Sequence, residues 1–141
     1  KMNIRSNAAS RSVEFDKEPI IRMSNTFIEP GDYDITELLS DIKKGVYIKN
    51  FMEWNIDDRR ENQRYVGFEA YLIKNGELDI NVKSPVLELT SKKFWSSVDA
   101  RSKNLDFKAA NCGKGEPMQG APVWTGAPDV RLRNIRIGNR S

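Results

Sequence analysis

The chain has 141 residues, with 23 Lys or Arg, 20 Asp or Glu and no His, so its formal net charge is +3 at pH 7. The charges of both signs are interspersed, which is typical of a solvated surface and argues against a nucleic-acid-binding face. The single Cys excludes an intramolecular disulfide, and without His only carboxylates of this chain could join that Cys around a transition metal.

The first residues are polar and lack clear periodicity. We therefore expect residues 1–14 to be a flexible arm or residues left from cloning, and residues 15–141 to form a single domain. The start lacks the apolar core of a signal peptide, and no apolar run approaches the ~20 residues that span a bilayer. These features predict a soluble, cytoplasmic protein with no membrane partner.

One amphipathic helix is predicted over about residues 34–44. Asp34 is placed as its N-cap and Glu37 follows three residues later, which is the spacing of a capping box. Apolar residues then recur on one face, and Gly45 supplies a left-handed stop after two lysines. We expect this helix to lie across a sheet.

Most of the remaining sequence predicts β-strands. The strongest signal is Asn75-Gly76, a two-residue hairpin turn that would pair Lys74 with Glu77 and give one continuous apolar face. Further strand candidates are residues 20–28, 46–56, 86–90, 105–110 and 130–137, the last with a bulge at Arg133-Asn134. The pattern favours a mainly β fold, an antiparallel β barrel or sandwich with one amphipathic α-helix.

Three polar stretches invite a functional interpretation, and each fits a structural one better. The stretch 113–115, Gly-Lys-Gly, lacks the G-x-x-x-x-G-K-[ST] spacing of a phosphate loop and predicts a glycine turn. Asp57 and Asp58 are adjacent, so they point in different directions and fit a solvated loop better than a metal or acid-base pair. Four basic residues near the end are more typical of an edge strand protected from aggregation than of a phosphate site; they are Arg131, Arg133, Arg136 and Arg140.

The only cysteine, Cys112, lies in the stretch "NCGKGEPMQGAPVW", whose glycines and prolines predict a sharp turn. A single cysteine is commonly an inert buried residue, and without His this one lacks a base that would make it a nucleophile. The flanking glycines allow close backbone approach, and Lys114 favours the thiolate, which is the form that binds metal. On the residues alone, both interpretations of Cys112 stay open.

Three stretches together resemble the C-terminal domain of the TldD/PmbA family, once labelled modulators of DNA gyrase. They are "IIRMSNTFIEPGD", "GVYIKNFMEWNIDDRRENQRYVGFEAYLIKNGEL" and "NCGKGEPMQGAPVW", in this order and at this spacing. The resemblance covers about residues 19–138. Proteins of this family are much longer, so the chain resembles their C-terminal piece.

The resemblance implies a zinc metallopeptidase that cleaves unfolded or short peptides inside a dimer. In the TldD-like branch, an upstream H-E-x-x-x-H motif supplies two histidine ligands and a glutamate base, and the Cys of the C-G-K stretch supplies the third protein ligand to zinc. Cys112 matches that position, whereas the PmbA (TldE) branch lacks the metal ligands. This chain alone is therefore expected to hold no catalytic residue and to be inactive.

The resemblance also suggests where a peptide substrate binds. We expect Asn111, Gly113 and Lys114 beside the metal ligand to contact it, and a sheet edge to pair with it as an added strand. The expected partners are an unfolded peptide and a second subunit, either a copy of the chain or a homologue. The alternative function is a non-catalytic peptide-binding or dimerisation β-domain, as in the metal-free branch. Nucleic-acid binding by the basic last strand ranks behind both.

Overall fold

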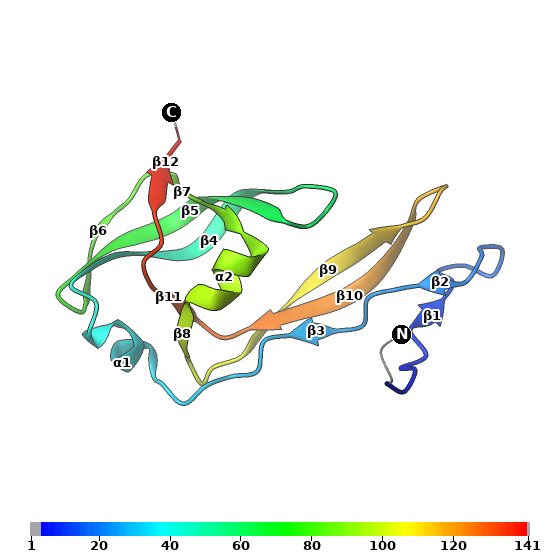
Figure 1. Ribbon diagram of the computed structural model, residues 1–141, viewed down its shortest axis with the longest axis horizontal. Helices are drawn as coiled ribbons and strands as arrows, with labels where there is room; N and C mark the ends of the chain where they lie inside the picture. Colours follow the sequence, from blue (N-terminus) through cyan, green and yellow to red (C-terminus); the bar gives the residue numbers. More distant parts are fainter. Residues whose placement is uncertain (1–3, 141) are drawn as a thin grey trace. The chain divides into compact units, whose positions relative to one another are not determined.

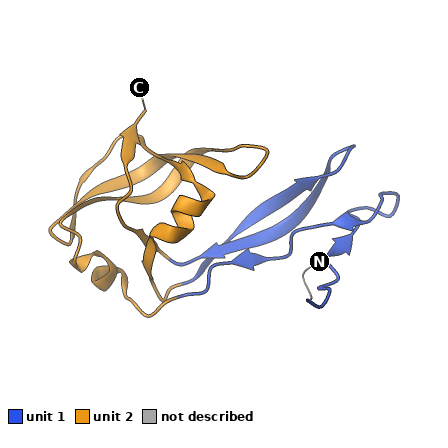
Figure 2. Cartoon of the chain, in the orientation of Figure 1, with its two compact units in different colours: residues 1–30, 105–128 blue, residues 31–104, 129–141 orange. Residues whose placement is uncertain are grey.

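A computed structural model describes residues 4–140 of the chain. It is mainly β with two short helices, as Figure 1 shows. The chain divides into two compact units, and Figure 2 colours residues 1–30 and 105–128 as unit 1 and residues 31–104 and 129–141 as unit 2. No helix among the described residues is long and apolar enough to cross a membrane.

Unit 2 is built on one antiparallel sheet in the order β12-β7-β5-β4, with β6 paired to β5. Two further strands pair with each other, β8 with β11. Helix α1 contacts β6, and helix α2 contacts β7 and β11. The bounds are α1 Ile35–Ser40, β4 Lys44–Ile56, β5 Asn62–Lys74, β6 Glu77–Asn81, β7 Pro85–Thr90, α2 Ser91–Ser97, β8 Val98–Arg101, β11 Val130–Leu132 and β12 Ile137–Asn139.

The apolar core of unit 2 lies around the middle of β5. Val66, Ala70 and Ile73 of that strand are at most 4% exposed. The other buried apolar side chains of this unit are Leu38 and Leu39 from α1, Val86 from β7 and Ala100 from β8. Removing these side chains from water is the main favourable term for folding this unit.

Unit 1 contains a three-stranded sheet in the order β3-β10-β9 and a separate pair, β1 with β2. β9 and β10 are antiparallel neighbours, whereas β3 runs parallel to β10. The bounds are β1 Ser10–Arg11, β2 Ile20–Ile21, β3 Thr26–Phe27, β9 Asp106–Lys114 and β10 Gln119–Ala127. The outer edge of β9 pairs with no other strand among residues 4–140, so β9 is a nine-residue edge strand.

The mainly β class is confirmed, and the sheets are open, not closed into a barrel. The helix expected over residues 34–44 begins as predicted, because the Glu37 carboxylate accepts a hydrogen bond from the Asp34 amide at 2.8 Å. It ends at Ser40, not at residue 44, because the carbonyls of Ile42 and Lys43 accept hydrogen bonds from the turn between β5 and β6. Gly45 therefore lies inside β4.

The hairpin at Asn75-Gly76 is confirmed, with Lys74 opposite Glu77. Both turn residues have positive φ, 52° and 86°, which is the backbone that Asn-Gly favours. The continuous apolar face is wrong, because a register shift past Ile73 places Tyr71 opposite Asn81 and leaves every residue of β6 exposed. Residues 1–14 contain β1, and the expected division into an arm and one domain stays a prediction.

Other strand boundaries differ from the predicted ones where glycine, proline or polar residues dominate the local sequence. Residues 20–28 form two short strands, β2 and β3, and residues 130–137 separate into β11 and the start of β12. The bulge was expected at Arg133-Asn134, but the register shift lies between Arg131 and Leu132 of β11. Asn134, with a φ of 54°, lies beyond the strand. The sequence analysis missed α2, β1, β8 and β10 altogether.

Candidate functional site

Cys112 lies in a regular strand, not in a turn as its neighbours suggested. It is the seventh residue of β9 and is paired with Ala121 of β10, and the turn comes after Lys114. Directly opposed residues of an antiparallel pair point to the same side of the sheet, and successive residues alternate. One face of the hairpin therefore carries Cys112, and the other carries Asn111 and Gly113.

The Cys112 face is covered by the segment that joins β2 to β3. The amide of Met23 donates a hydrogen bond to Cys112 Sγ at 3.4 Å, and the thiol itself is half-buried. The neighbouring Arg22 is only 2% exposed. Its Nη2 donates to the carbonyl of Cys112 and, at 2.7 Å, to the carbonyl of Gln119, so one guanidinium bridges β9 and β10.

This environment favours the thiolate form of Cys112. The hydrogen bond from the Met23 amide is the main cause that lowers the pKa of Cys112, and the adjacent guanidinium of Arg22 and the charge of Arg11 act in the same direction. Partial burial opposes them. Arg11 is held in place by donating to the carbonyl of Met23 at 2.7 Å.

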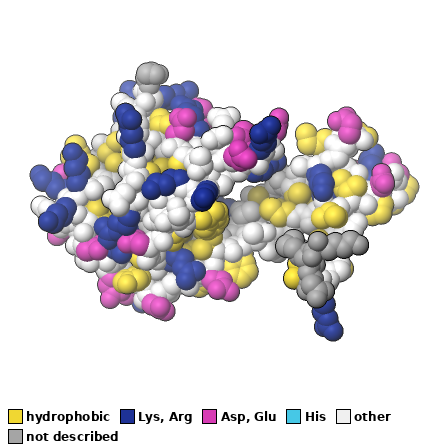
Figure 3. Space-filling model, in the orientation of Figure 1, with side chains coloured by type: hydrophobic (Ala, Val, Ile, Leu, Met, Phe, Trp, Pro, Cys, Tyr) yellow, Lys and Arg dark blue, Asp and Glu magenta, His cyan; other side chains and the backbone are white. Residues whose placement is uncertain are grey.

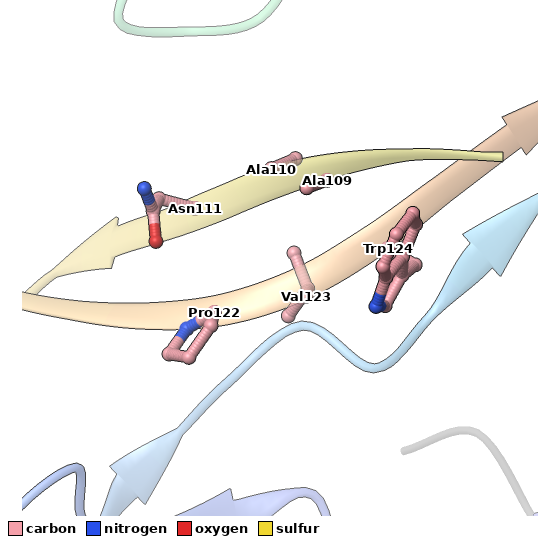
Figure 4. A pocket seen from close by; sticks show the side chains of 6 residues that line it. All are labelled: Ala109, Ala110, Asn111, Pro122, Val123 and Trp124. Atoms are coloured by element: carbon pink, nitrogen blue, oxygen red, sulfur yellow. The ribbon is translucent and has the colours of Figure 1, made fainter.

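The residues predicted to bind substrate are divided between the two faces. Lys114 shares the face of Cys112, where its Nζ donates to the carbonyl of Ile21 at 3.0 Å. Asn111 lies on the opposite face and lines an open pocket of about 380 Å³ with Ala109, Ala110, Pro122, Val123 and Trp124 (Figure 4). Lys114 thus lies on the face of the thiol, and Asn111 and Gly113 lie on the opposite face of the hairpin.

A metal ion would find one ligand here and not a complete site. The described residues contain no group of three or more His, Cys, Asp or Glu side chains that could hold an ion. The Cys112 thiol suits zinc in its chemistry, because zinc binds cysteine as the thiolate and this thiol has a lowered pKa. Further ligands would have to come from outside this chain.

The other stretches considered from the sequence have structural roles. The Asp57 carboxylate accepts hydrogen bonds from the amides of Glu61 and Asn62 at 2.8 and 3.1 Å, so it shapes the loop between β4 and β5. Its pKa is lowered by these bonds and by one from the Asn62 side chain, which is the largest cause. Gly115 has a φ of 96° in the turn after β9, which no helix follows, so the phosphate-loop interpretation is not supported.

Three of the four arginines near the end of the chain are engaged in ion pairs. Arg131 donates to Asp99 at 2.9 Å and to Asp41 at 2.6 Å, and Arg133 pairs with the same two carboxylates. Arg140 lies 3.4 Å from a carboxylate oxygen of Glu53. These partners occupy the guanidinium groups that a phosphate would need.

Sequence reasoning missed Arg22, Met23 and Gln119: the Met23 amide bonds to the thiol, and Arg22 links the carbonyls of Cys112 and Gln119. Arg22 and Cys112 are 90 positions apart, so no local spacing connects them. One signal was present: "PIIRMS" places an arginine in an apolar run. Such a residue is either at the surface or buried with a specific acceptor, and the second case is found here.

The fold and the site define a mainly β chain that presents one half-buried thiol on the edge strand β9. The model of the PmbA/TldA metallopeptidase C-terminal domain matches residues 1–139. The chain therefore belongs to this metallopeptidase family, and the family predicted from the sequence is confirmed.

The relatives agree with this assignment. A protein named metalloprotease from Methanocaldococcus jannaschii is 39% identical over 114 residues, which are 81% of this chain and 25% of the relative. A zinc metalloprotease TldD homolog from Saccharolobus solfataricus is 23% identical over 130 residues, which are 92% of this chain and 28% of the relative. The chain spans between 25% and 30% of the length of the curated relatives that it matches.

A solved structure shows the same fold. The crystal structure of TldE from Thermococcus kodakarensis superposes with a TM-score of 0.72 and 14% identity, over 95% of this chain and 28% of that chain. At this identity the likeness concerns the fold alone.

Proposed function

We propose that this chain is the cysteine-donating C-terminal domain of a cytoplasmic zinc metallopeptidase that cleaves unfolded or short peptides. The observation that carries the proposal is Cys112, whose Sγ accepts the Met23 amide at 3.4 Å and whose pKa is lowered by its surroundings. The names of the relatives, metalloprotease and zinc metalloprotease TldD homolog, support the reaction class and the metal. Cys112 is the metal ligand in this proposal.

A single thiolate holds zinc only together with other ligands, so the full-length protein would have to supply them. The resemblance places those ligands and the base in an upstream H-E-x-x-x-H motif. When bound in such a three-ligand site, zinc lowers the pKa of a water molecule to about 7 and polarises the peptide carbonyl. The role of this chain is to hold the thiolate at a fixed position on a paired strand.

Its second role is to bind the peptide along the outer edge of β9. This edge is nine residues long, contains Cys112 and pairs with no other strand among the described residues. A peptide added there as a strand makes backbone hydrogen bonds that tolerate many sequences. Lys114 on the thiol side and Asn111 and Gly113 on the opposite side are then positioned to contact alternate side chains of the peptide.

The test compares the full-length protein with its Cys112→Ser variant. We expect the unaltered protein to contain one zinc per subunit and to cleave an unstructured peptide, and the variant to lose both properties. The control is Ala127→Ser, which introduces the same hydroxyl at an exposed position at the end of β10, away from the outer edge of β9. A Cys112→Ser variant that retains zinc and activity would show that the cysteine is not a ligand.

The alternative is a non-catalytic domain for peptide binding or dimerisation, and exposed aromatic residues favour it. Phe51, Trp54 and Phe68 of β4 and β5 are 54%, 57% and 72% exposed, and Figure 3 shows apolar side chains at the surface of both units. Exposed apolar side chains mark an interaction surface where they form one contiguous patch. A full-length protein without the H-E-x-x-x-H motif, which binds peptide and no zinc, would support the alternative; its dimer could form with itself or with a homologue.

A further inference from the structure

Arg22 is a buried cation without a carboxylate partner. Its side chain belongs to a residue that is 2% exposed, and no acidic residue among residues 4–140 forms an ion pair with it. Burying an unpaired charge is costly, and arginines are almost never fully buried unless they are paired. The position of Arg22 therefore needs an explanation beyond packing.

Two of its three guanidinium nitrogens are also unused. Nη2 donates to the carbonyls of Cys112 and Gln119, but Nε and Nη1 have no hydrogen-bond acceptor in the part of the chain that the structure describes. A guanidinium presents five N–H donors in a rigid fork. Nη2 holds the backbone of both strands of the hairpin. The N–H groups of Nε and Nη1 remain available to an anion on the same face.

The anion available there is the sulfur of Cys112. The thiol lies on the face that residues 22 and 23 cover: the Met23 amide donates to Sγ at 3.4 Å, and Nη2 of the adjacent Arg22 donates to the carbonyl of Cys112 itself. The other cation near the thiol, Arg11, is directed to the carbonyl of Met23. A thiolate at Cys112 would complete both the charge balance and the hydrogen bonding of Arg22.

We infer that Arg22 is the positioning residue of the Cys112 thiolate: it locks β9 to β10 through two carbonyls and offers its remaining N–H groups to the sulfur. The inference rests on the proposed function, because it assigns to Arg22 the support of the ligand that Cys112 provides. Hydrogen bonds to a metal-binding group fix its orientation and tune its basicity, and their loss typically lowers metal affinity by about 10–100-fold.

The test measures metal binding by the full-length protein and its Arg22→Gln and Arg22→Lys variants. Zinc affinity is determined by competition with a chromophoric chelator, and the sulfur-to-metal charge-transfer band is recorded after loading with Co²⁺. We expect Arg22→Gln to lose about 10–100-fold in zinc affinity and to shift the Co²⁺ band to longer wavelength, because a thiolate without N–H donors holds its electrons less tightly. Arg22→Lys keeps the charge without the fork, so it should recover part of the affinity.

Arg131→Lys is the matched control for stability. Arg131 is also a largely buried arginine that donates to a backbone carbonyl, that of Leu38 at 3.0 Å, but it belongs to unit 2. We expect this variant to lower the melting temperature of the metal-free protein without changing zinc affinity or the Co²⁺ band. Circular dichroism confirms that each metal-free variant is folded at the temperature of the binding assay.

The outcomes separate this inference from the proposed function. If Cys112→Ser abolishes metal binding while Arg22→Gln binds zinc like the unaltered protein and leaves the Co²⁺ band in place, the role of Arg22 is overturned and that of Cys112 stands. If both Arg22 variants fail to fold, Arg22 is a structural clamp and the inference is also overturned. If Cys112→Ser retains zinc, the proposed function itself fails.

Discussion

Gly126 and Gly120 lie on the same strand and the same face of the hairpin, yet only one of them has space for a side chain. A Cβ at Gly126 would lie 2.7 Å from the ring of Phe107, which packs edge-to-face on Phe27 at 5.8 Å. At Gly120 nothing lies within 4 Å of that Cβ position. The sequence shows two similar glycines, and only the fold distinguishes them.

We therefore expect Gly126→Ala to lower the free energy of unfolding by ~1–3 kcal/mol, because the Phe107 ring must move out of its contact with Phe27. Gly120→Ala should be neutral or stabilising by up to ~1 kcal/mol, since it restricts only the unfolded chain. Urea denaturation of both variants measures the difference. Equal effects of the two substitutions would mean that the Phe107 ring does not limit Gly126.

Some residues of the candidate site could be identified from the sequence, and others could not. Cys112 was recognisable because it is the only cysteine and stands between residues that resemble a known motif. Arg22 was not, because its contacts to Cys112 and Gln119 span 90 and 97 positions. Asn111 was predicted to share a site with Cys112, but alternation along β9 places it on the opposite face. In a strand, the next residue along the chain points to the opposite face of the sheet, so neighbours in sequence need not share a site.

Secondary structure was predictable where the signal is local. The turn at Asn75-Gly76 and the start of α1 depend on neighbouring residues, and both are found. β10 was missed because its sequence, "QGAPVWTGA", contains two glycines and a proline, which are depleted in strands. Its pairing with β9 and β3 and the burial of Ala121 and Val123 outweigh those preferences, and neither is visible in the local sequence.

Helix α2 depends on a local cap that can be tested. The hydroxyl of Thr90 accepts a hydrogen bond from the amide of Lys93 at 3.1 Å and so satisfies one of the unpaired donors at the helix start. We expect Thr90→Ala to cost about 1 kcal/mol of stability, whereas Thr90→Ser retains the acceptor and most of the stability. Thermal unfolding of the two variants checks this, and identical midpoints would argue against the cap.

The ion pairs between α1, β8 and β11 give the stability a defined pH dependence. The pKa of Asp99 is lowered, mainly by hydrogen bonding to Arg131 and further by Arg133. A carboxylate with a lowered folded-state pKa contributes stability above its unfolded value of about 3.9, and the contribution is lost as the pH falls through the folded pKa.

Asp99→Asn should therefore reduce the free energy of unfolding by about 1 kcal/mol at neutral pH, because this cluster is partly exposed to solvent. The difference from the unaltered protein should shrink below about pH 4, because Asp99 is then protonated first in the unfolded chain and, at lower pH, in the folded state. Asp79→Asn, on the exposed strand β6, is the control and should change little. A deficit for Asp99→Asn that stays constant from pH 7 to pH 3 would contradict the assignment.

The chain as a whole distributes its buried apolar side chains unevenly. In unit 2 the core draws on α1, β5, β7 and β8, whereas in unit 1 only Ala121 and Val123 are buried hydrophobic residues among those described. Unit 1 depends more on hydrogen bonds between its segments. Arg22 donates to carbonyls of β9 and β10, and the amide of Trp124 donates to Asn25 Oδ1 at 2.9 Å. The proposed ligand thus lies in the unit with the smaller apolar core.

The free energy needed to open a region locally is larger where more apolar surface is buried. The two units should therefore differ in native-state hydrogen exchange. We expect the amides at the centre of β5, near Val66 and Ala70, to exchange with the free energy of global unfolding. The amides of β9 and β10 should exchange faster, through an opening of unit 1 that costs less than unfolding unit 2. Exchange measured at several low denaturant concentrations separates the two openings, because the smaller one exposes less surface and depends less on denaturant. If β5, β9 and β10 instead share one opening free energy and one denaturant dependence, the chain unfolds as a single cooperative unit. The hydrogen bonds of Arg22 would then stabilise unit 1 as much as an apolar core does.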